Sequence, residues 1–224
     1  MDWAAIRLSA ELAGLTTLLL LLLGLPLAYW LAFSRLRFRF LVEAVVALPL
    51  VLPPTVLGFY VLLALGPKSP LGQAYAALFG QGLPFTFQGL LLASVLYSLP
   101  FAVQPFTAAL AGVDRRLIEA SWCLGASRLR TLARVVVPLA RRGLVSGLVL
   151  TFAHTLGEFG VVLMVGGNLP GVTRTVSISI YDHVQALDYA AAGRTSALLL
   201  VVSFAVLAVT YGVQRRARGA WPLG

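Results

Sequence analysis

The sequence predicts an all-α integral membrane protein with five transmembrane helices. Of its 224 residues, 59% are hydrophobic and 11% are charged, and the mean hydropathy is +0.91. These values lie far on the apolar side of the soluble average. A helix needs roughly 20 apolar residues to cross a hydrocarbon layer about 30 Å thick. Five runs satisfy this length, so we expect one transmembrane domain over residues 1–224, with spans at about 8–33, 40–65, 89–113, 144–165 and 196–213.

The first run, 8–33, is expected to stay in the membrane as a helix. No basic cluster precedes it, it is longer than the apolar core of a secretory signal, and arginines follow it in place of a small-residue cleavage site. Pro26 lies inside this run, and a simple kink facing lipid explains it as well as a functional role does.

Prolines interrupt the second and third runs. A proline removes a backbone donor, and free carbonyls at membrane depth are tolerated where neighbouring protein or a water-filled cavity satisfies them. We therefore expect a transport pathway or its gates at these breaks, with uncharged polar side chains nearby. The predicted pathway and gate residues are Pro53, Pro54, Thr55, Pro100, Gln104, Thr151 and Glu158.

Glu158, in the stretch GEFG, is the most informative ionisable residue of the fourth run. Fifteen residues from the start of that run place it about 22 Å along a helix. Because a charge at membrane depth is costly, such a residue is by default a functional hypothesis. We expect its side chain to pair with a neighbouring helix beside Gly157 and Gly160. His154, four residues earlier, is one candidate partner, although a histidine satisfied elsewhere explains that residue equally simply.

The basic residues predict the orientation of the chain. Thirteen of the 17 arginines and lysines follow the first run, separate the third from the fourth, or follow the fifth. The other four are Arg7, Lys68, Arg174 and Arg194. Since flanking positive charge is retained in the cytoplasm, we expect the N-terminus outside and the C-terminus inside. The net charge of +9 then reflects membrane topology, and no nucleic-acid partner is expected.

The segment 114–143 is the largest predicted cytoplasmic feature. Asp114 is placed to cap a short helix, Gly125 to end it in a left-handed conformation, and Ser127 to start a second helix. Pro138 is expected to turn the chain back toward the membrane. An apolar stripe on the second helix is predicted from Leu129, Leu132, Val136 and Leu139. Physical reasoning alone leaves two interpretations, a docking element for a cytoplasmic partner or an amphipathic loop on anionic lipid.

The same segment resembles the EAA loop of bacterial ABC importer permeases. Glu119, Ala120 and Ser121 are followed at the family spacing by Gly125 and, after nine more residues and three valines, by Pro138. Ser121 replaces an alanine of the pattern, and valines replace its isoleucine and leucine. The resemblance implies a coupling helix that inserts into a groove on an ATP-hydrolysing subunit. The implied coupling residues are Glu119, Ala120, Ser121, Gly125, Ala126 and Pro138.

Three further stretches extend the resemblance over nearly the whole chain. LPLVLPPTVLGFYVL (48–62), HTLGEFGVVLMVGGNLPGVTRT (154–175) and the following VSISIYDHV are similar to molybdate ABC transporter permeases. Sulfate and thiosulfate permeases share similar stretches, so they remain the alternative substrate class. The resemblance implies a type I ABC importer permease in the bacterial cytoplasmic membrane, with molybdate and tungstate as substrates. A carboxylate such as Glu158 would repel a dianion, so we expect it not to coordinate the substrate.

The resemblance also implies the partners. They are a second copy of this chain, a homodimeric cytoplasmic ABC ATPase that carries ATP and Mg, and a periplasmic or lipid-anchored oxyanion-binding protein, all in contact with membrane lipid. The expected docking surface for the binding protein is formed by the outer loops, 66–88 and 167–195. In the second loop a helix on the outer interface is predicted from the spacing of Ile180, Tyr181, Val184 and Leu187.

Other classes fit the sequence less well. The only lysine, Lys68, stands in GPKSP and not in a Walker A loop, so we expect no ATP hydrolysis and no cofactor on this chain. The single cysteine, Cys123, excludes an intrachain disulfide, and no metal site is expected. Two histidines and scattered acids do not supply an intramembrane catalytic cluster. A secondary transporter would show symmetric repeats, which five unequal spans lack, and it would work without ATP.

Overall fold

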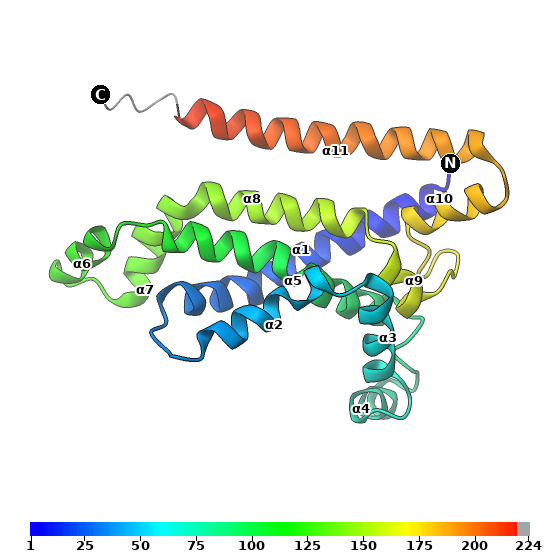
Figure 1. The fold of residues 1–224 in the computed structure, drawn as a ribbon, viewed down its shortest axis with the longest axis horizontal. Helices are drawn as coiled ribbons and strands as arrows, with labels where there is room; N and C mark the ends of the chain where they lie inside the picture. Colours follow the sequence, from blue (N-terminus) through cyan, green and yellow to red (C-terminus); the bar gives the residue numbers. More distant parts are fainter. Residues whose placement is uncertain (219–224) are drawn as a thin grey trace.

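The computed structural model describes residues 1–218, which form helices joined by short connections (Figure 1). Within these residues there is no β-strand, as the all-α prediction requires. The elements are α1 (Trp3–Phe33), α2 (Arg39–Val51), α3 (Pro54–Leu65), α4 (Pro70–Phe79), α5 (Phe87–Ala111), α6 (Arg115–Cys123), α7 (Arg128–Thr131), the π-helical turn η1 (Leu132–Val136), α8 (Val137–Leu156), α9 (Gly160–Gly166), α10 (Val176–Gln185) and α11 (Tyr189–Arg218).

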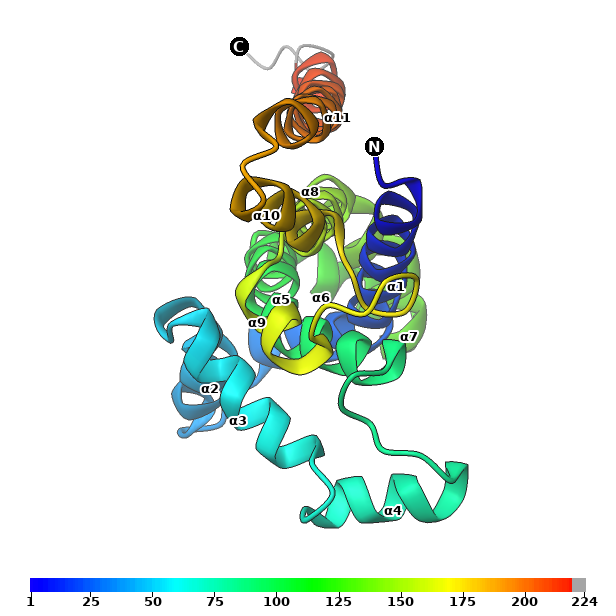
Figure 2. The same cartoon turned by 90° about the vertical axis from the view of Figure 1, so that its right-hand side faces the viewer.

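The centre of the molecule is a bundle of α1, α5 and α8 (Figures 1 and 2). Phe106 on α5 is fully buried there, in a cluster with apolar side chains of the other two helices. Glycines let α8 approach α5 closely: a Cβ added at Gly147 would lie 2.7 Å from Phe106 Cε1, and one at Gly143 would lie 2.5 Å from Ala109 Cβ. Small residues at such crossings allow the van der Waals contact that holds membrane helices together.

The second predicted span is broken in the middle. The helices α2 and α3 meet at an angle of 114° across Leu52 and Pro53. Proline at this position lacks the amide hydrogen that would continue α2, and Pro54 then starts α3. Residues 40–65 therefore form two helices and not one straight helix, and α3 with α4 projects away from the central bundle (Figure 2).

The fourth membrane helix begins before, and ends before, the apolar run 144–165 from which it was predicted. One continuous helical stretch, Arg128–Leu156, runs through α7, η1 and α8, and α7 lies at an angle to α8 (Figure 1). The change of direction predicted at Pro138 therefore falls at η1, just before the proline, and the helix is not interrupted there. The preceding π-turn replaces the usual spacing by a hydrogen bond from Val137 N to Leu132 O, which accommodates the proline in the first turn of α8. The helix ends at Leu156, so Glu158 lies in the break before α9 and not along a helix as expected.

The remaining helix, α11, lies beside the bundle on the side of α8 and α10 (Figure 2). Very little of its apolar surface is buried inside the chain. Four helical stretches of the described residues are long and apolar enough to cross a membrane, and the bent pair of α2 and α3 makes a fifth if it counts as one span. This confirms the predicted all-α membrane fold. The arginine-rich segments after α1 and around α6 and α7 gather at one end, opposite the N-terminus and α10 (Figure 1).

Candidate functional site

The segment predicted to couple to an ATP-hydrolysing subunit contains a helical hairpin, whose two arms are α6 and α7. Asp114 Oδ1 accepts a hydrogen bond from Arg116 N at 2.9 Å, and Ser127 Oγ accepts one from Arg130 N at 3.3 Å. Gly125 has φ +80°, and the amide of Ala126 bonds to the carbonyl of Ser121 at 3.1 Å to close the end of α6. These are the predicted caps and the predicted left-handed residue, so the local fold of the hairpin is confirmed.

A hydroxyl pair joins the two arms of the hairpin. Ser121 Oγ lies 3.0 Å from Thr131 Oγ1, and the Thr131 side chain is almost fully buried. The serine that departs from the EAA pattern thus holds α6 against α7. Sequence reasoning missed Thr131, whose single hydroxyl within a basic stretch gave no periodic signal. A Cβ added at Gly125 would meet nothing within 4 Å, so this chain needs the glycine for its backbone conformation and not for space.

The tip of the hairpin presents apolar side chains to the outside. Leu124 is 88% exposed, Leu129 is 79% exposed and Leu117 is 49% exposed. The predicted apolar stripe is buried only in part: Val136 is buried and Leu132 half-buried, whereas Leu129 and Leu139 are exposed. Thr131 and Ala140 are the other buried positions between Arg128 and Arg142. Exposed leucines on a short basic hairpin are typical of a surface that another protein covers.

The proline break between α2 and α3 packs directly on the GEFG stretch. A Cβ added at Gly160 would lie 2.7 Å from Pro54 Cβ, and one at Gly58 would lie 2.7 Å from Met164 Cβ. The two short helices α3 and α9 are therefore in close contact along their length. Pro53, Pro54 and Thr55 are exposed at this elbow.

A buried polar cluster lies between α5 and α8, next to the GEFG break. Ser98 Oγ is 3.0 Å from His154 Nδ1 and 2.8 Å from Thr155 Oγ1, and the imidazole stacks on Phe101 with ring centroids 3.7 Å apart. His154 thus finds its partner on α5 and not in Glu158. Glu158 is only 4% exposed, and neither of its carboxylate oxygens has a hydrogen-bond partner in the part of the chain that the structure describes. The fully buried Ser94 of α5 lies close enough to interact with this carboxylate, so the neighbouring helix that Glu158 faces is α5, although no hydrogen bond of standard geometry joins the two side chains.

The remaining pathway candidates lie in different surroundings. Pro100 and Thr151 are buried inside the bundle, and Thr151 Oγ1 donates to Gly147 O at 2.7 Å. Gln104 is exposed and lines a largely apolar cavity of about 520 Å³ between α1, α2 and α5, together with Glu43 and Thr107. The structure thus brings Pro54 against Gly160, two residues after Glu158, while Gln104 lines a separate cavity.

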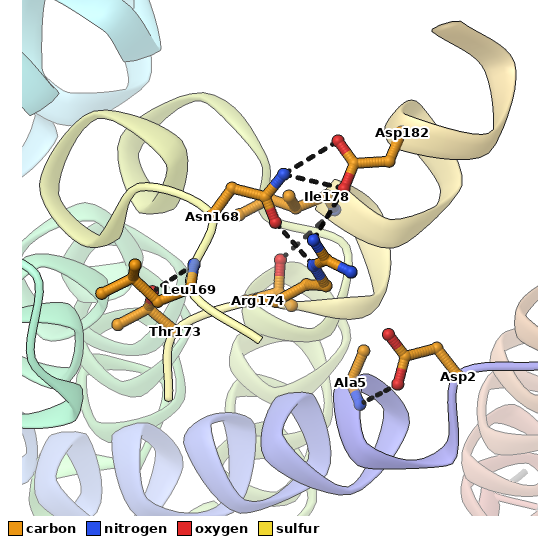
Figure 3. A network of polar contacts seen from close by, with 9 residues as sticks. Asp2, Ala5, Asn168, Leu169, Thr173, Arg174, Ile178 and Asp182 are labelled. Atoms are coloured by element: carbon orange, nitrogen blue, oxygen red, sulfur yellow. Dashed lines mark hydrogen bonds and ion pairs between the residues drawn. The ribbon is translucent and has the colours of Figure 1, made fainter. Parts of the chain in front are cut away.

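The connection between α9 and α10 is held by a polar network (Figure 3). Asn168 Nδ2 donates to both carboxylate oxygens of Asp182, at 2.9 and 2.7 Å, and Arg174 Nε donates to Asn168 Oδ1 at 2.6 Å. Arg174 Nη2 also lies 3.4 Å from Asp182 Oδ2. These contacts fix part of the loop 167–195 that was predicted to dock a binding protein. The resemblance included both NLPGVTRT and the stretch VSISIYDHV that contains Asp182, but nothing in the sequence indicates that Asp182 pairs with Asn168 and Arg174.

The predicted helix in this loop is present with different bounds. Ile180, Tyr181 and Val184 lie on α10, and Thr175 Oγ1 caps its start by accepting from Ile178 N at 3.5 Å. Leu187 was wrongly placed on this helix: it follows the helix end and has φ +58°. The other predicted docking loop, 66–88, contains α4.

Four or five candidate membrane spans within the described residues and an exposed helical hairpin describe an integral membrane component, and the family comparison identifies its class. The family model described as "Binding-protein-dependent transport system inner membrane component" matches residues 24–219. The chain therefore belongs to the family of inner membrane components of binding-protein-dependent transport systems. The matched range contains the hairpin, the proline elbow, the buried polar cluster and the α9–α10 loop.

Relatives with a more specific description extend over nearly the whole chain. The molybdenum transport system permease protein ModB of Azotobacter vinelandii is 53% identical over 214 residues, which cover 96% of this chain and 95% of the relative. ModB of Escherichia coli K12 is 36% identical over 184 residues, covering 82% and 80%. A probable sulfate transport system permease protein of Prototheca wickerhamii is 34% identical over 166 residues, covering 74% and 65%.

Solved ABC transporters have the same fold. A bacterial alginate ABC transporter, solved in complex with alginate pentasaccharide-bound periplasmic protein, superposes with a TM-score of 0.77 at 18% identity, covering 96% of this chain and 78% of that chain. The inward-facing MetNI methionine ABC transporter gives 0.73 at 17% identity, covering 95% and 94%. The predicted type I ABC importer permease fold is thus confirmed.

Proposed function

We propose that this chain is the permease subunit of an ATP-driven importer that carries molybdate, and tungstate with it, across the bacterial cytoplasmic membrane by alternating access. Two copies of the chain enclose the path on a two-fold axis. A separate homodimeric ATPase binds ATP and Mg and docks on the hairpins. A periplasmic or lipid-anchored oxyanion-binding protein delivers the substrate at the opposite end. This places the N-terminus outside and the hairpin and C-terminus in the cytoplasm.

The observation that carries the coupling role is the apolar tip of the hairpin. Leu124 and Leu129 are 88% and 79% exposed although they belong to a compact, doubly capped structure. Burying this surface in a groove of a partner would stabilise the complex by the hydrophobic effect. Glu119, Ala120, Ser121, Gly125, Ala126 and Pro138, which follow the EAA spacing, build this hairpin and the helix that leaves it.

The proposed substrate path follows the exposed polar and proline residues. Pro53 and Thr55 at the elbow and Gln104 on α5 are accessible in one protomer, and a second copy would cover them across the path. Pro54 transmits movement between the elbow and α9 through its contact with Gly160. Pro100, Thr151 and Glu158 are enclosed within the protomer and support its walls.

The substrate class rests on the relatives described as molybdenum permeases, one of which is 53% identical. The sulfate permease relative, at 34% identity, keeps sulfate as the second candidate. The test is uptake of labelled molybdate at nanomolar concentration in a large excess of sulfate, in cells that lack the gene for this chain and in cells where it is restored. Restored uptake that resists sulfate supports molybdate, whereas unchanged molybdate uptake with lost sulfate accumulation would assign the chain to sulfate.

A second experiment tests whether transport depends on a separate ATPase. In proteoliposomes that contain the chain with its ATPase and binding protein, accumulation should require ATP and should stop when ATP hydrolysis is blocked. Accumulation by the chain alone would contradict an ABC permease and would favour a secondary transporter.

A further inference from the structure

A cavity of about 470 Å³ lies between the end of α1 and the hairpin, apart from the exposed leucines of the hairpin tip. Its lining combines four charged and three aromatic side chains with an apolar floor. The lining includes Arg35, Arg115, Glu119 and Arg128, then Tyr29, Phe33 and Trp122, and the buried Ile118 and Val136. Its volume falls within the range of pockets that hold small organic ligands, so it is larger than a simple inorganic anion requires.

The charges in this cavity are not neutralised by the chain itself. Neither the three arginines nor Glu119 forms an ion pair with any residue that the structure describes. Three guanidinium groups against a single carboxylate leave a net positive charge in the lining. Guanidinium groups bind phosphate oxygens through paired, charge-assisted hydrogen bonds, and several of them around one cavity form a site for a tetrahedral anion.

We propose that this cavity binds the phosphate of an anionic membrane lipid, with the lipid's glycerol and first methylenes on the aromatic wall. Arg35 stands two residues after the last residue of α1, a helix apolar enough to cross the membrane, so the cavity opens at the membrane boundary. Tyr29 and Phe33 come from the final turns of that helix, and their rings pack together with centroids 4.9 Å apart. A free oxyanion gains nothing from this apolar half of the lining, whereas a phospholipid uses both halves.

A lipid bound in this cavity would restrict the movement of the hairpin. Its lining comes from α1, α6, α7 and η1, so a bound phosphate holds the hairpin against the membrane helix. The leucines of the tip do not line the cavity, so they stay free for a partner while the lipid is bound. Membrane anchoring and protein docking, the two interpretations that the sequence left open, therefore use different faces of one hairpin.

The test compares two triple variants of the purified full-length chain in detergent micelles. R35Q/R115Q/R128Q removes the arginines of the cavity. R37Q/R116Q/R130Q removes the same charge from the same three segments but from residues that do not line it. Native mass spectrometry then measures binding of phosphatidylglycerol and of phosphatidylcholine with identical acyl chains.

We expect the cavity variant to bind phosphatidylglycerol about a hundredfold more weakly than the wild type, because it loses three basic contacts with an anionic lipid, each worth about 1 kcal/mol. The control variant should stay within about threefold of the wild type, and phosphatidylcholine binding should be the same in all three proteins. Equal losses in the two variants would overturn the proposal, since the arginines would then act as bulk charge. If the cavity variant does not fold, R115Q and R116Q, neighbours on one helix, give the same comparison.

A competition arm identifies the source of the phosphate. Millimolar inorganic phosphate or molybdate should leave phosphatidylglycerol bound if the lipid is the ligand. Displacement by either anion would overturn the lipid assignment and identify the cavity as a site for free oxyanions. Neither result depends on whether the chain transports molybdate.

Discussion

Substitutions at Gly125 can distinguish two reasons for a glycine in the hairpin, its backbone conformation and the close approach of a partner. Its φ of +80° is a conformation in which an ordinary L-residue is strained, while an added Cβ would meet nothing within 4 Å. Placing an ordinary L-residue in this left-handed conformation costs roughly 1–2 kcal/mol, whereas asparagine costs less because its side chain forms local hydrogen bonds. We therefore expect Gly125→Ala to destabilise the hairpin more than Gly125→Asn, although alanine is the smaller residue.

The expected size follows from the closing hydrogen bond. The Ala126 amide is held by Ser121 O at 3.1 Å, and this bond breaks whenever the end of α6 opens. A cost of roughly 1–2 kcal/mol raises the open population about 5- to 30-fold, so hydrogen exchange of residues 119–131 should accelerate by that factor in Gly125→Ala. Exchange of α5 in the same protein should not change.

The assay is hydrogen exchange read by mass spectrometry on the full-length chain, followed by substrate-stimulated ATP hydrolysis in the assembled complex. Gly171→Ala is the matched control, because Gly171 has φ +75° and equally free space but lies in the α9–α10 connection. If Gly125→Asn impairs the hairpin or the hydrolysis more than Gly125→Ala does, the backbone explanation is refuted. Glycine would then be needed so that a partner can approach closely.

At two other positions, glycine is predicted to be needed because a neighbouring residue leaves no room for a side chain. Gly147→Val should lower the free energy of unfolding by about 1–3 kcal/mol in a thermal unfolding assay, because its Cβ would lie 2.7 Å from Phe106 Cε1 inside the bundle. The control is Gly14→Val, which should be nearly neutral in the same assay because an added Cβ meets nothing within 4 Å there. Gly160→Ala should displace α9 from Pro54, 2.7 Å from its new Cβ, and reduce transport while helix content stays constant. Normal transport by Gly160→Ala would show that the elbow does not depend on this contact.

The hairpin could be predicted from the sequence because its determinants are local. Asp114 and Ser127 cap the next turn, and Gly125 supplies a conformation that few other residues adopt, so a few positions specify each feature. The apolar stripe that contains Leu129 could not be assigned a partner by the same reasoning. Helical spacing identifies a face of a helix, but what that face contacts is set by the rest of the fold, and here the leucine points outward.

The elbow and the GEFG break could be predicted only in part. Proline in 49–54 predicted an interruption, yet the angle of 114° depends on how α3 packs against α9, more than 100 residues later in the sequence. The GEFG stretch is apolar enough to continue a span, and Gly157 alone, which caps the helix at Leu156, does not distinguish a helix end from a glycine at a close helix crossing. Likewise, the side chain that His154 contacts, Ser98, comes from another helix 56 residues away.

The continuity of the helix at Pro138 determines how the two ends of the protein are connected. A break there would have separated the hairpin from the membrane helix. Instead one helical stretch of 29 residues runs from Arg128 beside the hairpin loop, through the bend at η1, to Leu156 at the GEFG break. A movement of the hairpin can therefore be passed along this helix toward the point where Gly160 contacts Pro54. Because η1 is the one non-α segment of this stretch, we expect local bending to concentrate there, so hydrogen exchange should be faster in Leu132–Val136 than in the turns on either side. Uniform protection along the stretch would show that hairpin and break move as one rigid body.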